Sequence, residues 1–168
     1  LDNPKELTVS KLFVDFGARS RAEAQSKVRI GDMAVFHQPL ERAGGRLIAK
    51  AMDDRAGCAV LIEALERLEG SPHEIFAVFT VQEEVGLRGA RTAAFGVEPD
   101  VAVAVDVTWA GDTPEPEHRV AVEVGKGPAI KVKDASLISH GRVRRWMARA
   151  AEQRGIPHQY EVLPFGGT

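Results

Sequence analysis

Five acidic residues have the types and positions needed for metal chemistry, because each follows or interrupts an apolar stretch of the chain. They are Asp53, Asp54, Glu83, Glu84 and Asp106. Apolar stretches of this length are typical of buried strands, and a carboxylate at the end of such a strand faces the crevice where α/β proteins bind ligands. Burying several like charges together is costly unless a cation neutralises them. The pattern predicts a metal site, with two ions, in a hydrolase.

The first pair, Asp53 and Asp54, precedes a predicted helix. Aspartate is a favoured residue at a helix N-cap, and for this pair taken alone capping is the favoured interpretation. Two consecutive aspartates exceed what one cap requires. We therefore expect one of them to bind metal and the other to cap or orient.

The second pair, Glu83 and Glu84, ends an apolar run over residues 75–81. Two glutamates in a surface loop can serve solubility alone, but a preceding strand with almost no polar residue favours a functional role. Adjacent side chains on an extended backbone point apart. One glutamate is then free to ligate a metal while the other holds or moves a proton, and Gly86 and Gly89 permit a tight loop beside them.

The third acidic position, Asp106, interrupts an apolar run over residues 101–107. A solvated aspartate on an edge strand is the simpler alternative, since aspartate is disfavoured in central strands. With the other two pairs present, we expect Asp106 to be a third metal carboxylate. Oxygen ligands alone suit magnesium or calcium, whereas zinc usually also takes nitrogen or sulfur.

The elements that must position these carboxylates change in character along the chain. The first part has short strands and one short helix, which is typical of a small β-rich domain. From Arg46 onward strands alternate with longer helices, the pattern of an α/β layered fold. We expect helices at 20–28, 54–68 and 141–154, and strands at 7–16, 33–36, 47–51, 75–81, 101–107, 119–124, 129–132 and 158–163. Residues 119–124 and 129–132 are expected to pair with each other across residues 125–128.

Composition narrows the class of protein. The chain has 168 residues, of which 44% are hydrophobic and 27% are charged, as is ordinary for a globular protein. Its net charge of −2 argues against nucleic acid or an anionic membrane as a binding partner. A single cysteine, Cys58, excludes an internal disulfide and favours a reducing, cytoplasmic location. No apolar run approaches the roughly 20 residues of a transmembrane helix. Because residue 1 is Leu and the chain stops at Thr168, we expect a piece of a longer enzyme.

Taken in order, the acidic motifs resemble the signatures of the tetrahedral-type metallo-aminopeptidases, which include glutamyl and deblocking aminopeptidases and members labelled endoglucanases. The motifs that carry the resemblance are Asp53–Gly57, Gln82–Ala90, Val105–Asp106, Gly125–Pro128 and Gly166–Thr168. The linked motifs are specific together, whereas any one alone is weak. The resemblance covers nearly the whole chain.

The resemblance implies a three-layer α/β/α metallopeptidase domain with an inserted small β-barrel dimerisation domain. Residues 1–44 would be the C-terminal part of the inserted domain, and residues 45–168 would belong to the catalytic domain, incomplete at both ends. It also implies a homo-oligomer of dimers, up to a dodecamer, and two divalent metal ions per subunit, zinc or cobalt. By the same resemblance Asp53 bridges the metals, Glu84 and Asp106 each bind one, and Glu83 is the general base.

The implied activity is removal of N-terminal residues from peptides by water activated between two metals. The family's two histidine ligands fall outside this sequence, and none of its five histidines is assigned as a ligand: His37, His73, His118, His140 and His158. Two alternatives stay open. One is a different metal-dependent hydrolase, such as a carboxypeptidase, a deacylase or a glycosidase-labelled relative. The other is a non-catalytic fragment or assembly subunit.

Overall fold

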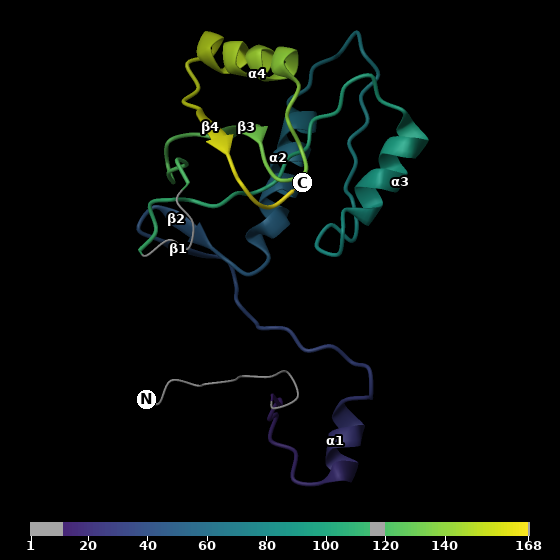
Figure 1. Ribbon diagram of the computed structural model, residues 1–168. Helices are drawn as coiled ribbons and strands as arrows, with labels where there is room; N and C mark the ends of the chain where they lie inside the picture. Colours follow the sequence, from purple (N-terminus) through teal and green to yellow (C-terminus); the bar gives the residue numbers. More distant parts are fainter. Residues whose placement is uncertain (1–11, 115–119, 168) are drawn as a thin grey trace. The chain divides into compact units, whose positions relative to one another are not determined.

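The computed structural model describes residues 12–114 and 120–167, shown in Figure 1. The chain divides into two units. The N-terminal unit ends at Gln38 and the C-terminal unit begins at Pro39. Each has its own local structure and is described separately.

The N-terminal unit contains helix α1, Arg21–Lys27. Its start is fixed by Ser20, whose side-chain oxygen accepts a hydrogen bond from the backbone N–H of Glu23 at 3.2 Å. Glu23 in turn accepts from the backbone N–H of Arg19 at 2.9 Å and pairs with Lys27 at 3.0 Å. Reciprocal bonding of this kind satisfies donors that a helix start leaves free, so the helix predicted at 20–28 is confirmed.

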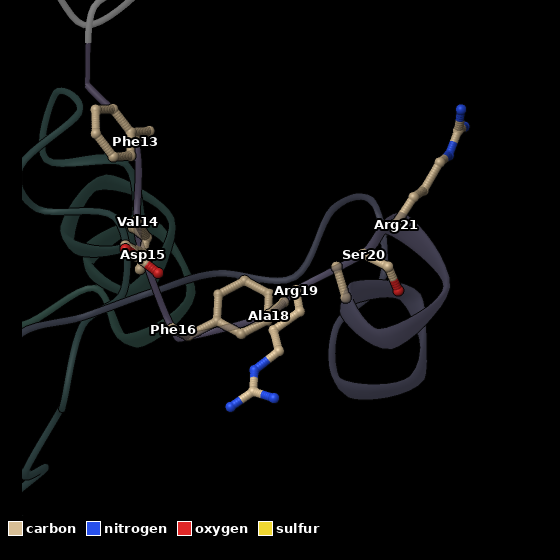
Figure 2. A pocket seen from close by; sticks show the side chains of 9 residues that line it. Phe13, Val14, Asp15, Phe16, Ala18, Arg19, Ser20 and Arg21 are labelled. Atoms are coloured by element: carbon tan, nitrogen blue, oxygen red, sulfur yellow. The ribbon is translucent and has the colours of Figure 1, made fainter.

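The strands predicted in the N-terminal unit are wrong where the structure describes them. Residues 33–36, and residues 12–16 of the predicted strand at 7–16, belong to no strand; residues 7–11 lie outside the described part. Figure 2 shows a shallow pocket beside α1, lined on one side by Phe13, Val14 and Phe16. Phe13 is 87% exposed, and Phe36 is 91% exposed. Apolar spacing alone does not make a strand, because the ladder also needs a partner of matching register.

The C-terminal unit opens with a hairpin of β1, Glu41–Ala43, and β2, Arg46–Ile48. The strands pair antiparallel, with Glu41 opposite Ile48. Gly44 and Gly45 connect them, with φ values of 55° and 79°. A two-residue hairpin loop with positive φ at both positions matches the twist of its strands, and glycine adopts it without steric cost. The strand predicted at 47–51 is therefore shorter, and its partner was not expected.

Three helices follow in this unit: α2, Met52–Glu66; α3, Arg88–Val97; and α4, Gly141–Gln153. The first and last confirm the predictions at 54–68 and 141–154. Helix α4 stops where Gly155 takes φ +63°, and Ile156 N–H bonds back to the Ala151 carbonyl at 2.9 Å. Glycine after the last turn is the usual way to satisfy a helix's final carbonyls. Helix α3, with two glycines in ten residues, was not predicted as a helix.

The buried core lies around two further strands, β3, Ala129–Lys133, and β4, Gln159–Val162. They pair in parallel and are connected through α4, which packs on β3 in a β-α-β arrangement (Figure 1). Ile130 on β3, Ala148 on α4 and Leu163 after β4 are each buried. This supports the expected α/β class, because parallel neighbours need a crossover of this type.

The expected pairing of 119–124 with 129–132 is wrong, because β3 pairs with β4 instead. The side-chain amide of Gln159 instead forms hydrogen bonds with the backbone of the segment before β3. It donates to the Glu123 carbonyl at 3.0 Å and to the Gly127 carbonyl at 2.8 Å, while its oxygen accepts from Glu123 N–H at 2.9 Å. These bonds join the turn before β3 to β4.

The predicted strands at 75–81 and 101–107 are also absent, since neither segment joins a ladder among the described residues. That part of the chain holds two sheets of two strands each, so the structure is a mixed α/β fold, and the three-layer arrangement that the resemblance implies stays a prediction. None of the described helices combines the length and apolar character that spanning a membrane requires.

A glycine contact at the β3–β4 junction gives a direct test of this arrangement. A Cβ added at Gly127, where φ is +94°, would overlap the Pro157 carbonyl, whereas nothing lies within 4 Å of a Cβ added at Gly125, where φ is +87°. We expect Gly125→Ala to cost about 1–2 kcal/mol of unfolding free energy from backbone strain. Gly127→Ala should cost about 1–3 kcal/mol more because of the overlap. Urea unfolding of both variants measures the difference, and equal losses would contradict the close approach.

Candidate functional site

The first acidic pair lies at the start of α2, where the backbone departs from helical geometry. Ala51 has φ +53°, and Asp53 and Asp54, joined by a cis peptide bond, both have non-helical dihedral angles. A left-handed φ is disfavoured for residues with a Cβ, and such conformations concentrate at functional sites.

Asp54 performs the capping role expected of one member of this pair. Its Oδ1 accepts a hydrogen bond from the backbone N–H of Gly57 at 3.0 Å. Gly57 is buried, and a Cβ added there would lie only 2.8 Å from Asp54 Cγ. The glycine is what lets the carboxylate fold over the helix start. Its importance was not predicted, although a glycine three positions after an aspartate in a first turn was visible in the sequence. The metal role of Asp53 stays a prediction.

The second pair lies in a tight loop that is closed at the start of α3. The carbonyl of Glu83 accepts from Gly86 N–H at 3.1 Å and from Leu87 N–H at 2.9 Å. The carbonyl of the preceding residue, Gln82, accepts a hydrogen bond from Arg88 N–H at 3.2 Å. Gln82 has φ +57°, so a strained residue directly precedes Glu83.

Both glycines that were expected to permit this loop contribute to its geometry. Gly86 has φ +113°, a conformation that side chains rarely adopt. Gly89 donates its N–H to the Val81 carbonyl at 3.0 Å, and a Cβ there would overlap the Val81 backbone. The predicted tight loop is confirmed.

The third acidic residue, Asp106, lies in an extended segment and is half-buried. Its Oδ1 accepts from the backbone N–H of Val107 at 2.8 Å. The residues that follow, Thr108 and Trp109, contact β4 and the loop after it, as described below.

Electrostatic interactions connect the three acidic positions. Burial raises the pKa of Glu83, and the negative charges of four other residues raise it further: Asp106, Glu84, Asp53 and Asp54. Burial also raises the pKa of Asp54, which the Gly57 hydrogen bond partly offsets and the charges of Asp106 and Asp53 reinforce. Carboxylates from three separate segments thus influence one another. Their predicted roles at a metal site stay predictions.

The chemistry of this donor set fits a divalent cation. All the groups are carboxylates, which bind hard or borderline cations, and a cation among them would offset the repulsion that raises the Glu83 and Asp54 pKa values. Across residues 12–114 and 120–167, no three histidine, cysteine, aspartate or glutamate side chains are grouped closely enough to hold an ion. The cluster therefore provides the charge for a metal site without a formed coordination shell.

A comparison with known protein families identifies the chain. The family model of the M42 glutamyl aminopeptidases matches residues 2–168. The chain belongs to this family. The matched residues include all of the motifs that carry the resemblance, so the family assignment agrees with it.

Individual relatives agree with the family assignment. A protein named putative aminopeptidase from Acetivibrio thermocellus is 52% identical over 168 residues, which is all of this chain and 51% of the relative. Among solved structures, aminopeptidase APDkam598 from the archaeon Desulfurococcus kamchatkensis has a TM-score of 0.92 at 41% identity, covering 99% of this chain and 48% of that one. The dodecameric PhTET1-12s structure has a TM-score of 0.73 at 37% identity, covering 92% and 47%. The chain spans about half the length of these relatives.

The Asp54–Gly57 contact predicts opposite effects for two alanine substitutions within helices. Gly96 in α3 has nothing within 4 Å of an added Cβ, so Gly96→Ala should stabilise the protein by about 0.5–1 kcal/mol. Gly57→Ala should instead destabilise it by about 1 kcal/mol, because the new methyl group displaces Asp54 and breaks its bond to the Gly57 N–H. Chemical denaturation of both variants tests this; stabilisation by Gly57→Ala would show that Asp54 does not cap α2.

Proposed function

We propose that this chain supplies part of the active site of a metal-dependent aminopeptidase, which removes N-terminal residues from peptides. The observation that carries the proposal is the raised pKa of Glu83, which burial and four surrounding carboxylates produce together. An anionic ligand would worsen this repulsion and a neutral one would leave it uncompensated, whereas cations would relieve it. Membership of the M42 family supports the peptidase chemistry.

The roles proposed for the carboxylates follow the family resemblance. Asp53 would bridge two divalent ions, zinc or cobalt, while Glu84 and Asp106 would each bind one of them. When bound, such ions lower the pKa of water toward about 7 and polarise a substrate carbonyl. Because the visible ligands are all oxygen, we expect the family's histidine ligands to complete the set.

Glu83 is proposed as the residue that moves the proton. It sits beside the presumed ligands and its pKa is raised, which improves a carboxylate as a general base. It would take a proton from the attacking water and return it to the leaving amine. Cations bound to its neighbours would offset their negative charge, leaving burial as the main influence on its pKa.

The finer architecture is also a proposal. Residues 1–44 would form the C-terminal part of an inserted β-barrel dimerisation domain, and residues 45–168 part of a three-layer catalytic domain. The dodecameric neighbour supports a homo-oligomer built from dimers. A cytoplasmic location is proposed from the single cysteine, Cys58.

Replacing Glu83 by glutamine tests its role as the base. We expect Glu83→Gln to retain two metals per chain while kcat falls by about 10²–10⁴-fold, since the amide cannot accept the proton. Glu69→Gln, an exposed change of the same type, should leave both unchanged. Elemental analysis with intact mass, together with steady-state kinetics on an N-terminally free peptide, gives both quantities. Normal turnover by Glu83→Gln would remove Glu83 from this role.

Asp53→Ala addresses metal binding instead. Loss of a bridging carboxylate should reduce the bound metal from about two ions to one or none, while the exposed control Asp100→Ala keeps both. Full occupancy in Asp53→Ala would refute the bridging assignment. Chelator treatment of the wild-type protein should abolish activity, whereas a glycosidase using two carboxylates would be indifferent to it.

A further inference from the structure

Two buried carboxylates and one partly exposed ammonium group lie together at β3 and β4, outside the acidic cluster. Glu161 on β4 and Asp134 just after β3 are each only 2% exposed. Lys131 lies between them, with its Nζ 2.9 Å from Glu161 Oε2 and 3.2 Å from Asp134 Oδ2. We call these three residues the buried ionic group.

Two members of the buried ionic group have pKa values shifted toward their charged forms. Burial alone would raise the pKa of Asp134, but the N–H groups of Ser136 and Leu137, each 2.8 Å from its Oδ1, and the Lys131 ammonium lower it overall. Burial opposes the charged form of Lys131, yet the hydrogen bonds to Glu161 and Asp134 raise its pKa overall.

Stability does not explain such a group. Charges removed from water lose solvation, and replacing buried ion pairs by apolar residues is often neutral or stabilising by about 1–4 kcal/mol. What the group does provide is a fixed hydrogen-bond acceptor, because Lys131 contacts only one oxygen of Glu161. The other oxygen is directed at a distant part of the chain.

That distant part is the segment that carries Asp106. Thr108 Oγ1 donates a hydrogen bond to Glu161 Oε1 across 53 residues of sequence. The next residue, Trp109, packs edge-to-face on Phe165 in the loop after β4, with ring centroids 6.3 Å apart and planes at 82°. Residues 101–107 join no β-ladder in the described part of the chain, so strand pairing does not hold this segment in place. These two side-chain contacts join the segment to β4 and the loop that follows it.

We propose that Glu161 is a positioning residue for the Asp106 carboxylate. Lys131 pairs with one oxygen of Glu161 and orients the carboxylate, Glu161 accepts the hydrogen bond of Thr108, and Thr108 fixes the backbone two residues after Asp106. The inference rests on the proposed function, because it takes Asp106 as a metal ligand. Residues that orient ligands in this way typically change metal affinity or activity by about 10–100-fold when they are lost.

Cobalt binding to the metal-free protein, expressed from its complete gene, tests the proposal. The variant is Thr108→Val, which keeps the shape of the side chain and removes its donor; Thr108→Ser restores the donor. Thr92→Val is the matched control, because Thr92 bonds only to backbone carbonyls of its own helix, α3. Calorimetry gives the Co²⁺ affinity, and the visible absorption of bound Co²⁺ reports the geometry of its ligands.

We expect Thr108→Val to bind Co²⁺ about 10–100-fold more weakly with an altered absorption spectrum. Thr108→Ser and Thr92→Val should match the wild-type protein in both. If Thr108→Val does not fold, Thr108→Ala provides the same loss of donor with less bulk.

The outcomes separate this inference from the function on which it rests. Wild-type affinity and spectrum in Thr108→Val would overturn the positioning role while leaving the metal site intact. A loss that Thr108→Ser does not restore would also overturn it, because the hydroxyl would then not be the cause. A wild-type protein that binds no Co²⁺ would overturn the proposed function, and the inference with it.

Discussion

The repulsion among five carboxylates is the constraint on which the rest of this structure depends. Two unit charges about 4 Å apart repel by about 4 kcal/mol at an effective dielectric constant of about 20, so such a cluster disperses unless the backbone holds it. Left-handed residues precede two of the three acidic positions, Ala51 and Gln82. The loop that contains Glu83 is closed on α3 by a series of short backbone hydrogen bonds. The backbone conformation and its hydrogen bonds thus hold the carboxylates in place against their mutual repulsion.

Local features of this fold were predictable from the sequence. Helices α1, α2 and α4 follow from periodicity and end signals, and Ser20 and Gly155 mark boundaries that the structure confirms. The tight loop beside Glu83 was also predictable, from Gly86 and Gly89, whereas the metal roles of the acidic residues stay predictions. Each of these inferences uses residues close in sequence or a general rule of topology.

Pairing between distant segments was not predictable in the same way. The apolar runs at 75–81 and 101–107 look like strands, but a strand exists only where a partner of matching register is present. Gln159 shows the difficulty: its side chain substitutes for the backbone partner expected beside Glu123. Lys131 and Glu161 likewise resemble the solvated face of a strand, and only the parallel pairing of β3 with β4 reveals that they form an ion pair.

The closure of the Glu83 loop on α3 has an electrostatic consequence. The aligned peptide dipoles of a helix place roughly half a positive charge at its N-terminus, and hydrogen bonds from Leu87 and Arg88 hold the loop directly against that end of α3. This fixed partial charge lies beside the backbone of the Glu83 loop and requires no bound ion. Substitutions in the first turn of α3 therefore act on the loop through the backbone bonds that hold it there.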